Sequence, residues 1–452
     1  MSYEHPTTGS ADWPVVHPNA AGLDIGAETI WACVPSDRDP TPVRSFGTCT
    51  PDLVALADWL VACRITTVAM ESTGVYWIPI YDLLEARGLH VVLVNAHHLK
   101  IVPGRKSDVQ DCQWIQRLHS YGLLRGSFRP DADITVLRAY TRQRATLVEQ
   151  RAVHIQLMQK AMQQMNLQLT QVVSDITGVT GMQIIRAIVT GERDPVVLAQ
   201  FRHPRCRSSQ ETIAKALTGS YRAEHVFALS QALTLYDCYT TQIAACDAEI
   251  ERQYAVMEPV WDDDTPPPPL PPDPKRNTHS KNAPAGDVRQ ALYDLLGIDL
   301  TAVDGLHAST VQIIISEIGT DMGKWPTEKH FCSWLDLAPH HDITGGRIVR
   351  RRTLKVRNRA AQALRMAAQA VSRSQTALGA FYRRIRARAG PERAVTATAH
   401  KLARIIYHLL KQHEPYTPLH AEVYEEQQRD RAVRQLERRA ARLGFTLAPQ
   451  PA

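Results

Sequence analysis

Residues 21–35 read Ala-Gly-Leu-Asp-Ile-Gly-Ala-Glu-Thr-Ile-Trp-Ala-Cys-Val-Pro. The two apolar runs of this stretch, 21–25 and 29–35, flank a short turn, a pattern that predicts two paired strands. An acid, Asp24, ends the first run. The stretch therefore predicts the start of a β-sheet with a carboxylate at a strand end.

Strand and helix patterns alternate downstream of this stretch. A third strand is predicted over 43–47, a helix over 51–63, a fourth strand over 66–70, a helix over 75–87, a fifth strand over 90–94 and a helix over 107–121. Three strands followed by helix, strand, helix, strand and helix is the order of a ribonuclease H-like α/β domain. We expect that domain over residues 21–130.

Three further acids stand at matching topological positions. Glu71 ends the fourth predicted strand, and Asp108 and Asp111 begin the last helix. Their i, i+3 spacing puts both aspartates on one helical face, in line with Ile115 and Leu118, the face that packs inward. Inward carboxylates are costly unless they are paired or bind a metal ion.

Together, Asp24, Glu71, Asp108 and Asp111 predict an oxygen-only site suited to Mg²⁺, with Mn²⁺ as the alternative ion. Two such ions could support phosphoryl transfer by activating a nucleophile and stabilising a leaving oxygen. Each acid alone has an ordinary explanation as well. Asp24 fits a turn, and Asp108 fits a first-turn acid favoured by the helix dipole. Two histidines, 97 and 98, fit either ligands or a surface loop.

The chain has 452 residues, too many for one ordinary core, and its 44% hydrophobic and 22% charged shares are those of a globular protein. Residues 1–14 show no secretory signal, and no run approaches the ~20 apolar residues of a membrane helix. The eight cysteines form no CxxC pair. We therefore expect a cytoplasmic protein without a disulfide framework or zinc ribbon and without a membrane partner.

The net charge of +6 is modest, but its distribution is uneven. Residues 345–404 hold sixteen lysines and arginines and one acid, Glu392. A solvated helix face normally mixes signs, because like charges one turn apart repel. The stretch favours a polyanion partner, with nucleic acid as the obvious candidate, over a merely basic surface.

The rest of the chain divides by composition. We expect a disordered tail over 1–20, a helical coiled-coil region over 131–260, a Pro-rich linker over 261–287, a mainly helical domain over 288–415 and a charged helical tail over 416–452. The heptad positions are Val148, Ile155, Met162 and Leu169, with Met158 and Met165 between them, and then Leu229, Tyr236, Ile243 and Ile250. Each stripe is about three heptads long, so an antiparallel hairpin within one chain and a dimer are equally open.

Several segments resemble the DEDD transposases of insertion-sequence family one-hundred-ten, relatives of the pilin-gene invertases. The segments 22–34, 69–100 and 104–124 resemble the family's RuvC-like N-terminal domain. The segments 303–339, 343–348 and 396–411 resemble its C-terminal transposase domain. The resemblance implies a transposase or site-specific DNA recombinase in which Asp24, Glu71, Asp108 and Asp111 bind Mg²⁺. It also implies donor and target DNA, a bridge-type guide RNA, and a dimer or tetramer.

The resemblance further implies a serine nucleophile that becomes linked to the cleaved DNA. This chain has Thr344 at that position, followed by two glycines. Thr344 keeps the hydroxyl, although a simple turn before the basic segment explains the same residues. The residues expected to contact nucleic-acid phosphates are Arg347, Arg350, Arg351, Arg352, Lys355, Arg357 and Arg359.

A second departure from the family lies in the turn 303–308. His307 replaces a glycine of the family's phosphate-binding turn and Asp304 adds a negative charge, so packing between helices is the expected role. Two rival functions remain open. One is a structure-selective, Mg²⁺-dependent endonuclease of the Holliday-junction resolvase type, and the other is an inactive nucleic-acid-binding relative.

Overall fold

A computed structural model describes residues 14–72, 74–95, 108–261, 268–272, 281–352 and 358–448. Within these, the side chains of residues 108, 340–343, 351 and 352 are not described. The chain divides into two compact units, residues 1–129 and 130–452. Each unit is described by itself.

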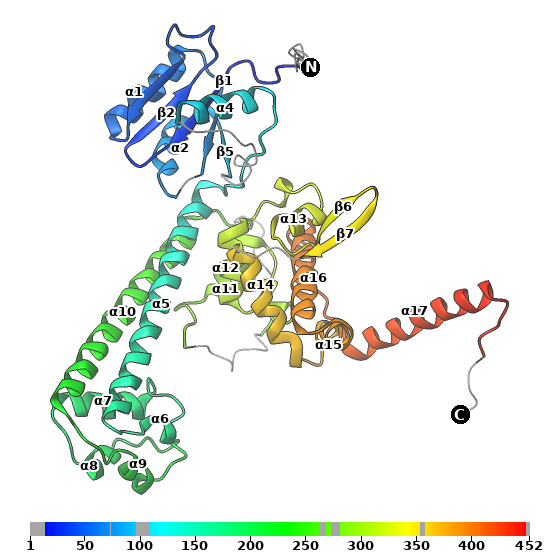
Figure 1. The fold of residues 1–452 in the computed structure, drawn as a ribbon. Coiled ribbons are helices and arrows are strands. Elements are labelled where there is room, and N and C mark those ends of the chain that lie inside the picture. The colour runs from blue at the N-terminus through cyan, green and yellow to red at the C-terminus, as the bar shows by residue number, and fades with distance from the viewer. Residues whose placement is uncertain are drawn as a thin grey trace, which may run out of the picture. The chain divides into compact units, whose positions relative to one another are not determined.

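The first unit is built on a five-stranded mixed sheet (Figure 1). Its strands are β1 (Ala20–Ile25), β2 (Thr29–Cys33), β3 (Val43–Gly47), β4 (Thr67–Glu71) and β5 (His90–Val94). Their order in the sheet is β3-β2-β1-β4-β5, with β1, β2 and β3 antiparallel and β4 and β5 parallel to β1. This is the order of an RNase H-like sheet, and all five strands lie where the sequence pattern predicts them.

The two faces of this sheet pack against different helices. Leu23 and Met70 belong to the larger apolar core, beneath α1 (Thr50–Ala62) and α2 (Trp77–Ala86). The opposite face packs through Ala69 against α4 (Asp108–Ser120). Successive strand residues alternate between the faces, so each strand supplies side chains to both cores.

The second unit begins with a helical arm. Its two long helices, α5 (Ala132–Gln164) and α10 (Ala223–Val256), pack alongside each other within one chain (Figure 1). Between them lie α6 (Leu169–Val172), α7 (Val179–Thr190), α8 (Pro195–Ala199) and α9 (Gln210–Ala216).

The predicted apolar stripe along α5 is wrong at its last position. Met158 and Met162 are buried on α5, as predicted, but α5 ends at Gln164 and Leu169 begins the separate helix α6. The physical cause is Asn166, which has a φ of 56°. Asparagine tolerates this left-handed conformation, which stops a helix.

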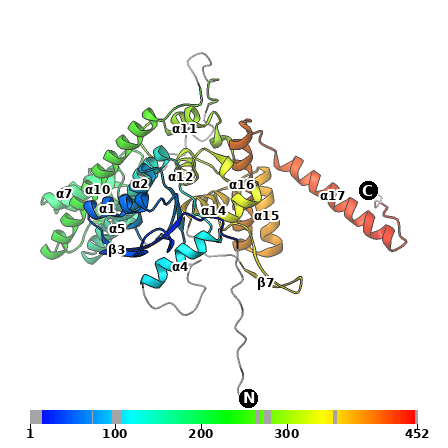
Figure 2. The same cartoon turned by 90° about the horizontal axis from the view of Figure 1, so that it is seen from above.

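The C-terminal helices form the rest of the second unit. They are α11 (Val288–Leu296), α12 (Ala308–Ile318), α13 (Glu328–Trp334), α14 (Arg359–Ala370), α15 (Ala377–Ala389), α16 (Pro391–Gln412) and α17 (Ala421–Arg442), with short 3₁₀ turns at Leu300–Ala302, Met322–Lys324 and Val371–Arg373. Helices α14 and α15 both pack on α16 (Figures 1 and 2). The α14 face is built from small residues such as Ala360 and Ala368, which let the helices approach closely.

The segment 288–415, predicted to be mainly helical, also contains a short hairpin. Strands β6 (His340–Thr344) and β7 (Arg347–Arg352) form a separate two-stranded sheet between α13 and α14. The predicted Pro-rich linker is described only in part. There, the carbonyl oxygens of Pro268 and Pro271 accept hydrogen bonds from Tyr293 and Arg289 of α11.

Within the part of the chain that the structure describes, no helix combines the length and the apolar character that crossing a bilayer requires.

Candidate active site

Two of the predicted acids lie side by side at the ends of neighbouring parallel strands. The β1–β4 register pairs Leu23 with Met70. The next residues along the two strands are Asp24 and Glu71, so the same register sets these acids next to each other. Both side chains are half-buried, and both fall on the sheet face opposite the Leu23–Met70 core. Asp24 lies within β1, so its interpretation as a turn residue is wrong.

Helix α4 covers the face on which these acids lie. A β-carbon on Gly22 would come within 2.5 Å of the Cys112 carbonyl oxygen and 2.3 Å of the Gln116 amide nitrogen. Only a residue without a side chain permits such a close approach. Gly22, two residues before Asp24, therefore allows the backbone of α4 to pack directly against β1.

The first turns of α4 lie close to Asp24. The pKa of the Cys112 thiol is raised by its hydrogen bond with Cys33, by burial, and also by the negative charge of Asp24. Asp111, which precedes Cys112, is half-buried, and one turn further on Ile115 is buried against Ala69 and Val94. The predicted inward face of α4 is thus confirmed for Ile115, and Asp111 shares it.

Asp108 is the first residue of α4, one turn before Asp111, but its side chain lies outside the described part of the chain, as do residues 97 and 98. Among the described side chains, no three of the types His, Cys, Asp or Glu approach closely enough to hold a metal ion. The donor set itself is all carboxylate oxygen, which is the set that Mg²⁺ prefers. Asp24, Glu71 and Asp111 carry donors of this type, but the structure does not bring the three carboxylates close enough together to hold one ion.

Thr344 lies in the second unit, at the tip of the β6–β7 hairpin. It ends β6 and pairs with Arg347 across Gly345 and Gly346, whose φ values are 56° and 74°. Two successive residues with positive φ make the tight two-residue turn typical of hairpins. The Thr344 side chain is exposed. The turn geometry predicted as the ordinary explanation is present, and it leaves the hydroxyl accessible.

The residues predicted to contact nucleic acid have different positions. Arg347 and Arg350 are exposed on β7, and Arg359 is exposed at the start of α14. Arg351 and Arg352 belong to β7 with undescribed side chains, and Lys355 and Arg357 lie outside the described residues. Between Arg347 and Arg350 lie two apolar residues that are also exposed, Ile348 and Val349.

The turn at residues 303–308 packs closely against the end of α14. A β-carbon on Gly305, which has a φ of 84°, would come within 2.8 Å of the Ala367 carbonyl oxygen and 2.4 Å of a Val371 methyl group. Val303 and Leu306 on either side are fully buried. This geometry agrees with a packing role for the turn.

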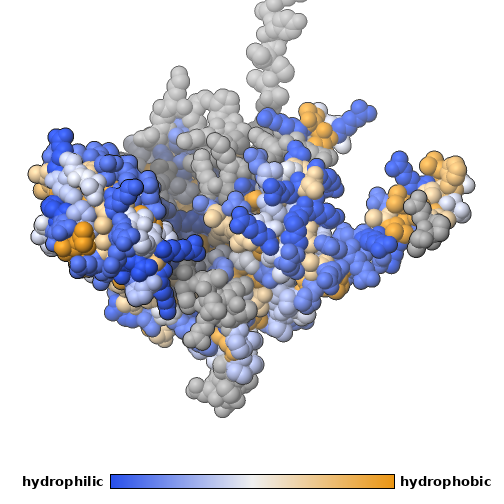
Figure 3. All heavy atoms as spheres, turned by 90° about the horizontal axis from the view of Figure 1, so that it is seen from below, coloured by the Kyte–Doolittle hydropathy of each residue, from blue (hydrophilic) through white to orange (hydrophobic). Residues whose placement is uncertain are grey.

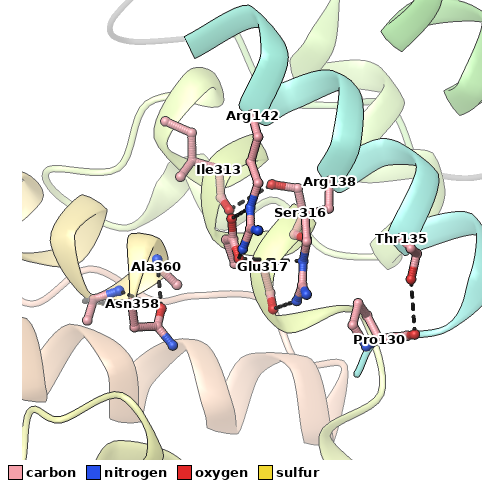
Figure 4. Close-up of polar contacts among 10 residues, drawn as sticks. Pro130, Thr135, Arg138, Arg142, Ile313, Ser316, Glu317, Asn358 and Ala360 are labelled. Atoms are coloured by element: carbon pink, nitrogen blue, oxygen red, sulfur yellow. Dashed lines mark hydrogen bonds and ion pairs between the residues drawn. The ribbon is translucent and has the colours of Figure 1, made fainter. Parts of the chain in front are cut away.

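Sequence patterns did not indicate the polar joint between the arm and the C-terminal helices (Figure 4). Arg142 of α5 donates two hydrogen bonds to the carboxylate of Glu317, at 2.8 and 2.7 Å. Arg138, one turn earlier, donates to the carbonyl oxygens of Ser316 and Glu317 at the end of α12. The only sequence signal is the i, i+4 spacing of the two arginines, which predicts a shared face but no partner.

The first unit is thus a mixed α/β domain with an RNase H-like strand order, and the second unit is mainly helical. Residues 21–167 match the model of the DEDD transposase family, and residues 299–383 match that of the transposase family IS116/IS110/IS902. The chain therefore belongs to the IS110 family of DEDD transposases, which act on insertion sequences. No curated protein matches the chain.

Proposed function

We propose that the protein moves an insertion sequence by phosphoryl transfer at a Mg²⁺ site formed by Asp24, Glu71, Asp108 and Asp111. The observation that carries this proposal is the β1–β4 register, which sets Asp24 beside Glu71 under the helix that bears the two aspartates. In this proposal the two strands supply two of the donors and α4 supplies the other two. Mn²⁺ fits the same donor set.

When bound, a divalent ion would supply positive charge to the scissile phosphate and the leaving oxygen. The chain's own residues set up that chemistry. The Gly22 contact keeps α4 close to the sheet, and burial on the α4 side limits the water around the carboxylates. A carboxylate in a drier environment binds a cation more strongly.

We further propose that the Thr344 hydroxyl is the nucleophile. In this step a bond forms between Thr344 Oγ and phosphorus while the bond from phosphorus to the leaving strand oxygen breaks, and the hydroxyl proton passes to a base. Support comes from the exposed position of Thr344 and from the two glycines that follow it. Neither glycine has a β-carbon to keep DNA at a distance, and Arg347 and Arg350 are placed to bind flanking phosphates.

The substrates of this proposal are donor and target DNA, selected by a bridge-type guide RNA, with a dimer or tetramer as the working assembly. The family membership and the basic stretch 345–404 support it. RNA that copurifies with the protein from its native host should contain one enriched, structured species encoded by the element. Sequencing that finds only mixed cellular RNA would contradict guided recognition.

The metal proposal is tested with labelled DNA that carries the element's ends. Cleavage should require Mg²⁺ or Mn²⁺ and stop with EDTA. The variants Asp24→Asn and Asp111→Asn keep the side-chain shape but lose the charge, so we expect them to lose at least about a hundredfold in cleavage while still binding DNA. Asp58→Asn is the matched control, because Asp58 is exposed on α1 and paired with Arg87. Equal cleavage by all three variants would refute the site.

The same assay separates recombination from simple hydrolysis. A nucleophilic hydroxyl leaves the protein linked to the DNA, whereas an endonuclease that activates water leaves free ends. Cleavage that depends on Mg²⁺ without any protein–DNA adduct would favour the resolvase-type endonuclease. Binding without cleavage would favour the inactive relative.

A further inference from the structure

Helices α15 and α16 carry a large excess of positive charge. Together they hold eight lysines and arginines and one acid, Glu392. Of the eight cations, Arg404 forms an ion pair with a described acid, Glu328. Helix α17 packs on α15 and carries six arginines and five acids, so the excess belongs to α15 and α16. Like charges repel, so such an excess favours binding of an anion.

Two of these cations share one aromatic site. The Arg384 guanidinium carbon lies 5.7 Å from the ring centre of Phe381 and 5.7 Å from that of Tyr424. The Lys401 ammonium nitrogen lies 4.7 and 5.0 Å from the same two rings. The rings stabilise each cation by cation–π attraction. They also hold the two positive charges next to each other, and the repulsion between these charges opposes the cation–π attraction.

Two further cations lie close enough to affect Lys401. The pKa of the Lys401 ammonium is lowered by burial and then by the positive charges of Arg384, Arg404 and Arg431. Arg431 lies two turns after Tyr424 on the same face of α17, and the residue between them on that face is the neutral Gln428. Among the described residues, Arg384, Lys401 and Arg431 have no carboxylate partner.

The hydroxyl of Tyr424 supplies an independent observation. Tyr424 is 6% exposed, packed against Ala377, Ala380 and Phe381, and its hydroxyl has no hydrogen-bond partner among the described residues. A buried hydroxyl without a partner is costly. The neighbouring Arg384 and Lys401 carry donors and no acceptor, so neither can accept the Tyr424 proton. An anionic oxygen would accept a hydrogen bond from this hydroxyl and would also neutralise the cations.

We propose that Arg384, Lys401, Arg431 and the Tyr424 hydroxyl form a second binding site for the phosphate groups of a nucleic-acid backbone, separate from the β6–β7 hairpin. We name this group the Tyr424 cluster. The long side chains of Arg384 and Arg431 are exposed and can move to admit a phosphate. The projecting α17 is mostly hydrophilic along its length (Figure 3). The proposal rests on nucleic acid as the partner, but not on the metal site or on Thr344.

The site is tested by measuring binding of the whole protein to duplex DNA and, separately, to structured RNA, with EDTA present so that cleavage plays no part. Each phosphate contact contributes about 0.9 to the slope of log affinity against log salt for duplex DNA and about 0.7 for a single strand. The double variant Arg384→Met, Arg431→Met should reduce the magnitude of that slope by the amount expected for the loss of about one to two phosphate contacts. Arg429→Met is the matched control, because Arg429 is exposed on the opposite side of α17. An unchanged slope with both nucleic acids, or the same loss in the control, would overturn the proposal.

Tyr424→Phe provides a second variant that keeps the ring and removes only the hydroxyl. Because the hydroxyl is buried without a partner, its loss should leave the melting temperature unchanged or raise it. Loss of a hydrogen bond to phosphate should weaken binding by about tenfold at low salt. Unchanged affinity, or a loss of affinity that accompanies a lower melting temperature, would refute the site. A loss restricted to DNA or to RNA would identify which of the two supplies the phosphates, whereas loss of cleavage by Asp24→Asn reports only on the metal site.

Discussion

Arg142 and Glu317 are 175 residues apart in the chain and form a two-pronged ion pair. Nε of Arg142 donates to one carboxylate oxygen of Glu317, and Nη2 donates to the other. The Glu317 side chain is 7% exposed, whereas Arg142 is about half exposed at 47%. The pair fixes the helical arm to α12, and its planar geometry specifies one orientation of the arginine.

We expect Glu317→Gln to destabilise the second unit by about 2–4 kcal/mol. The substitution removes the charge that Arg138 and Arg142 both face, and breaking a buried pair leaves an uncompensated cation; the partial exposure of Arg142 reduces the cost. Urea unfolding followed by circular dichroism measures the change. Glu249→Gln is the control, because the Glu249–Arg252 pair lies on the surface of α10, where such pairs contribute little. Equal stability of the two variants would show that the joint does not hold the unit together.

The two units differ in how much of them the sequence could predict. The strands β1 to β5 follow from local alternation of apolar residues, and the position of Asp24 and Glu71 follows from where those strands end. The hairpin at residues 340–352 was missed, although Gly345 and Gly346 between Ile343 and Ile348 form a recognisable hairpin signal. Thr344 and the two glycines after it indicate a turn, but residues 347–352 do not alternate between apolar and polar side chains, so they do not indicate a second strand.

Long-range pairing could not be predicted from one sequence. Local spacing placed Arg138 and Arg142 on one face of a helix, but nothing in the order of residues names Glu317 as their partner. The Tyr424 cluster is similar, because three separate helices supply its members. The periodicity of a sequence identifies which residues share a helix face, but the residues that this face contacts are known only from the fold.

The contact between Gly22 and α4 predicts a severe effect of a small change. Gly22→Ala would place a methyl group against the backbone of Cys112 and Gln116, so α4 must move away from β1. We expect a loss of about 2 kcal/mol or more in unfolding free energy and, on the proposed site, loss of metal-dependent cleavage. Gly126→Ala is the control, since its β-carbon would only touch a Val92 methyl at 3.6 Å. Matching melting curves for the two variants would contradict the close packing.

A buried histidine predicts acid sensitivity of the first unit. His119 is 3% exposed and its Nε2 lies 2.8 Å from the Thr67 hydroxyl oxygen. Burial, and then the nearby His17 and His90, lower the pKa of His119 from 6.5 to about 4. Between about pH 6.5 and pH 4, His119 is therefore protonated in the unfolded chain but neutral in the folded chain.

The stability that depends on neutral His119 is thus fully present above pH 6.5 and is lost as the pH falls towards 4. Its full size is about 3 kcal/mol. His119→Gln cannot titrate, so its unfolding free energy should fall less steeply between pH 7 and pH 4.5 than that of the wild type. Parallel pH profiles for the two proteins would show that His119 is not the responsible group.

Substitutions of Thr344 provide the most direct test of the proposed nucleophile. The hydroxyl is exposed at the hairpin tip, and the two glycines after it leave room for a DNA backbone. Thr344→Ala removes the attacking oxygen and should abolish both the covalent adduct and recombination. Thr344→Ser keeps the oxygen and removes only the methyl group that crowds in-line attack, so activity should be retained or rise. Neither change disturbs the turn, because the positive φ values belong to Gly345 and Gly346.

The measurement is a denaturing gel of protein trapped on labelled, nicked DNA, followed by mass spectrometry of the linked peptide. DNA attached to the peptide that contains Thr344 supports the proposal. An adduct that persists in Thr344→Ala, or that maps to a serine of α12 or α13, means that another hydroxyl attacks. Arg434→Met is the control for surface charge on the second unit, because Arg434 is exposed on α17, a different element from the hairpin. The carboxylate variants distinguish the remaining case: if they lose cleavage while Thr344→Ala keeps it, the metal site functions without this threonine.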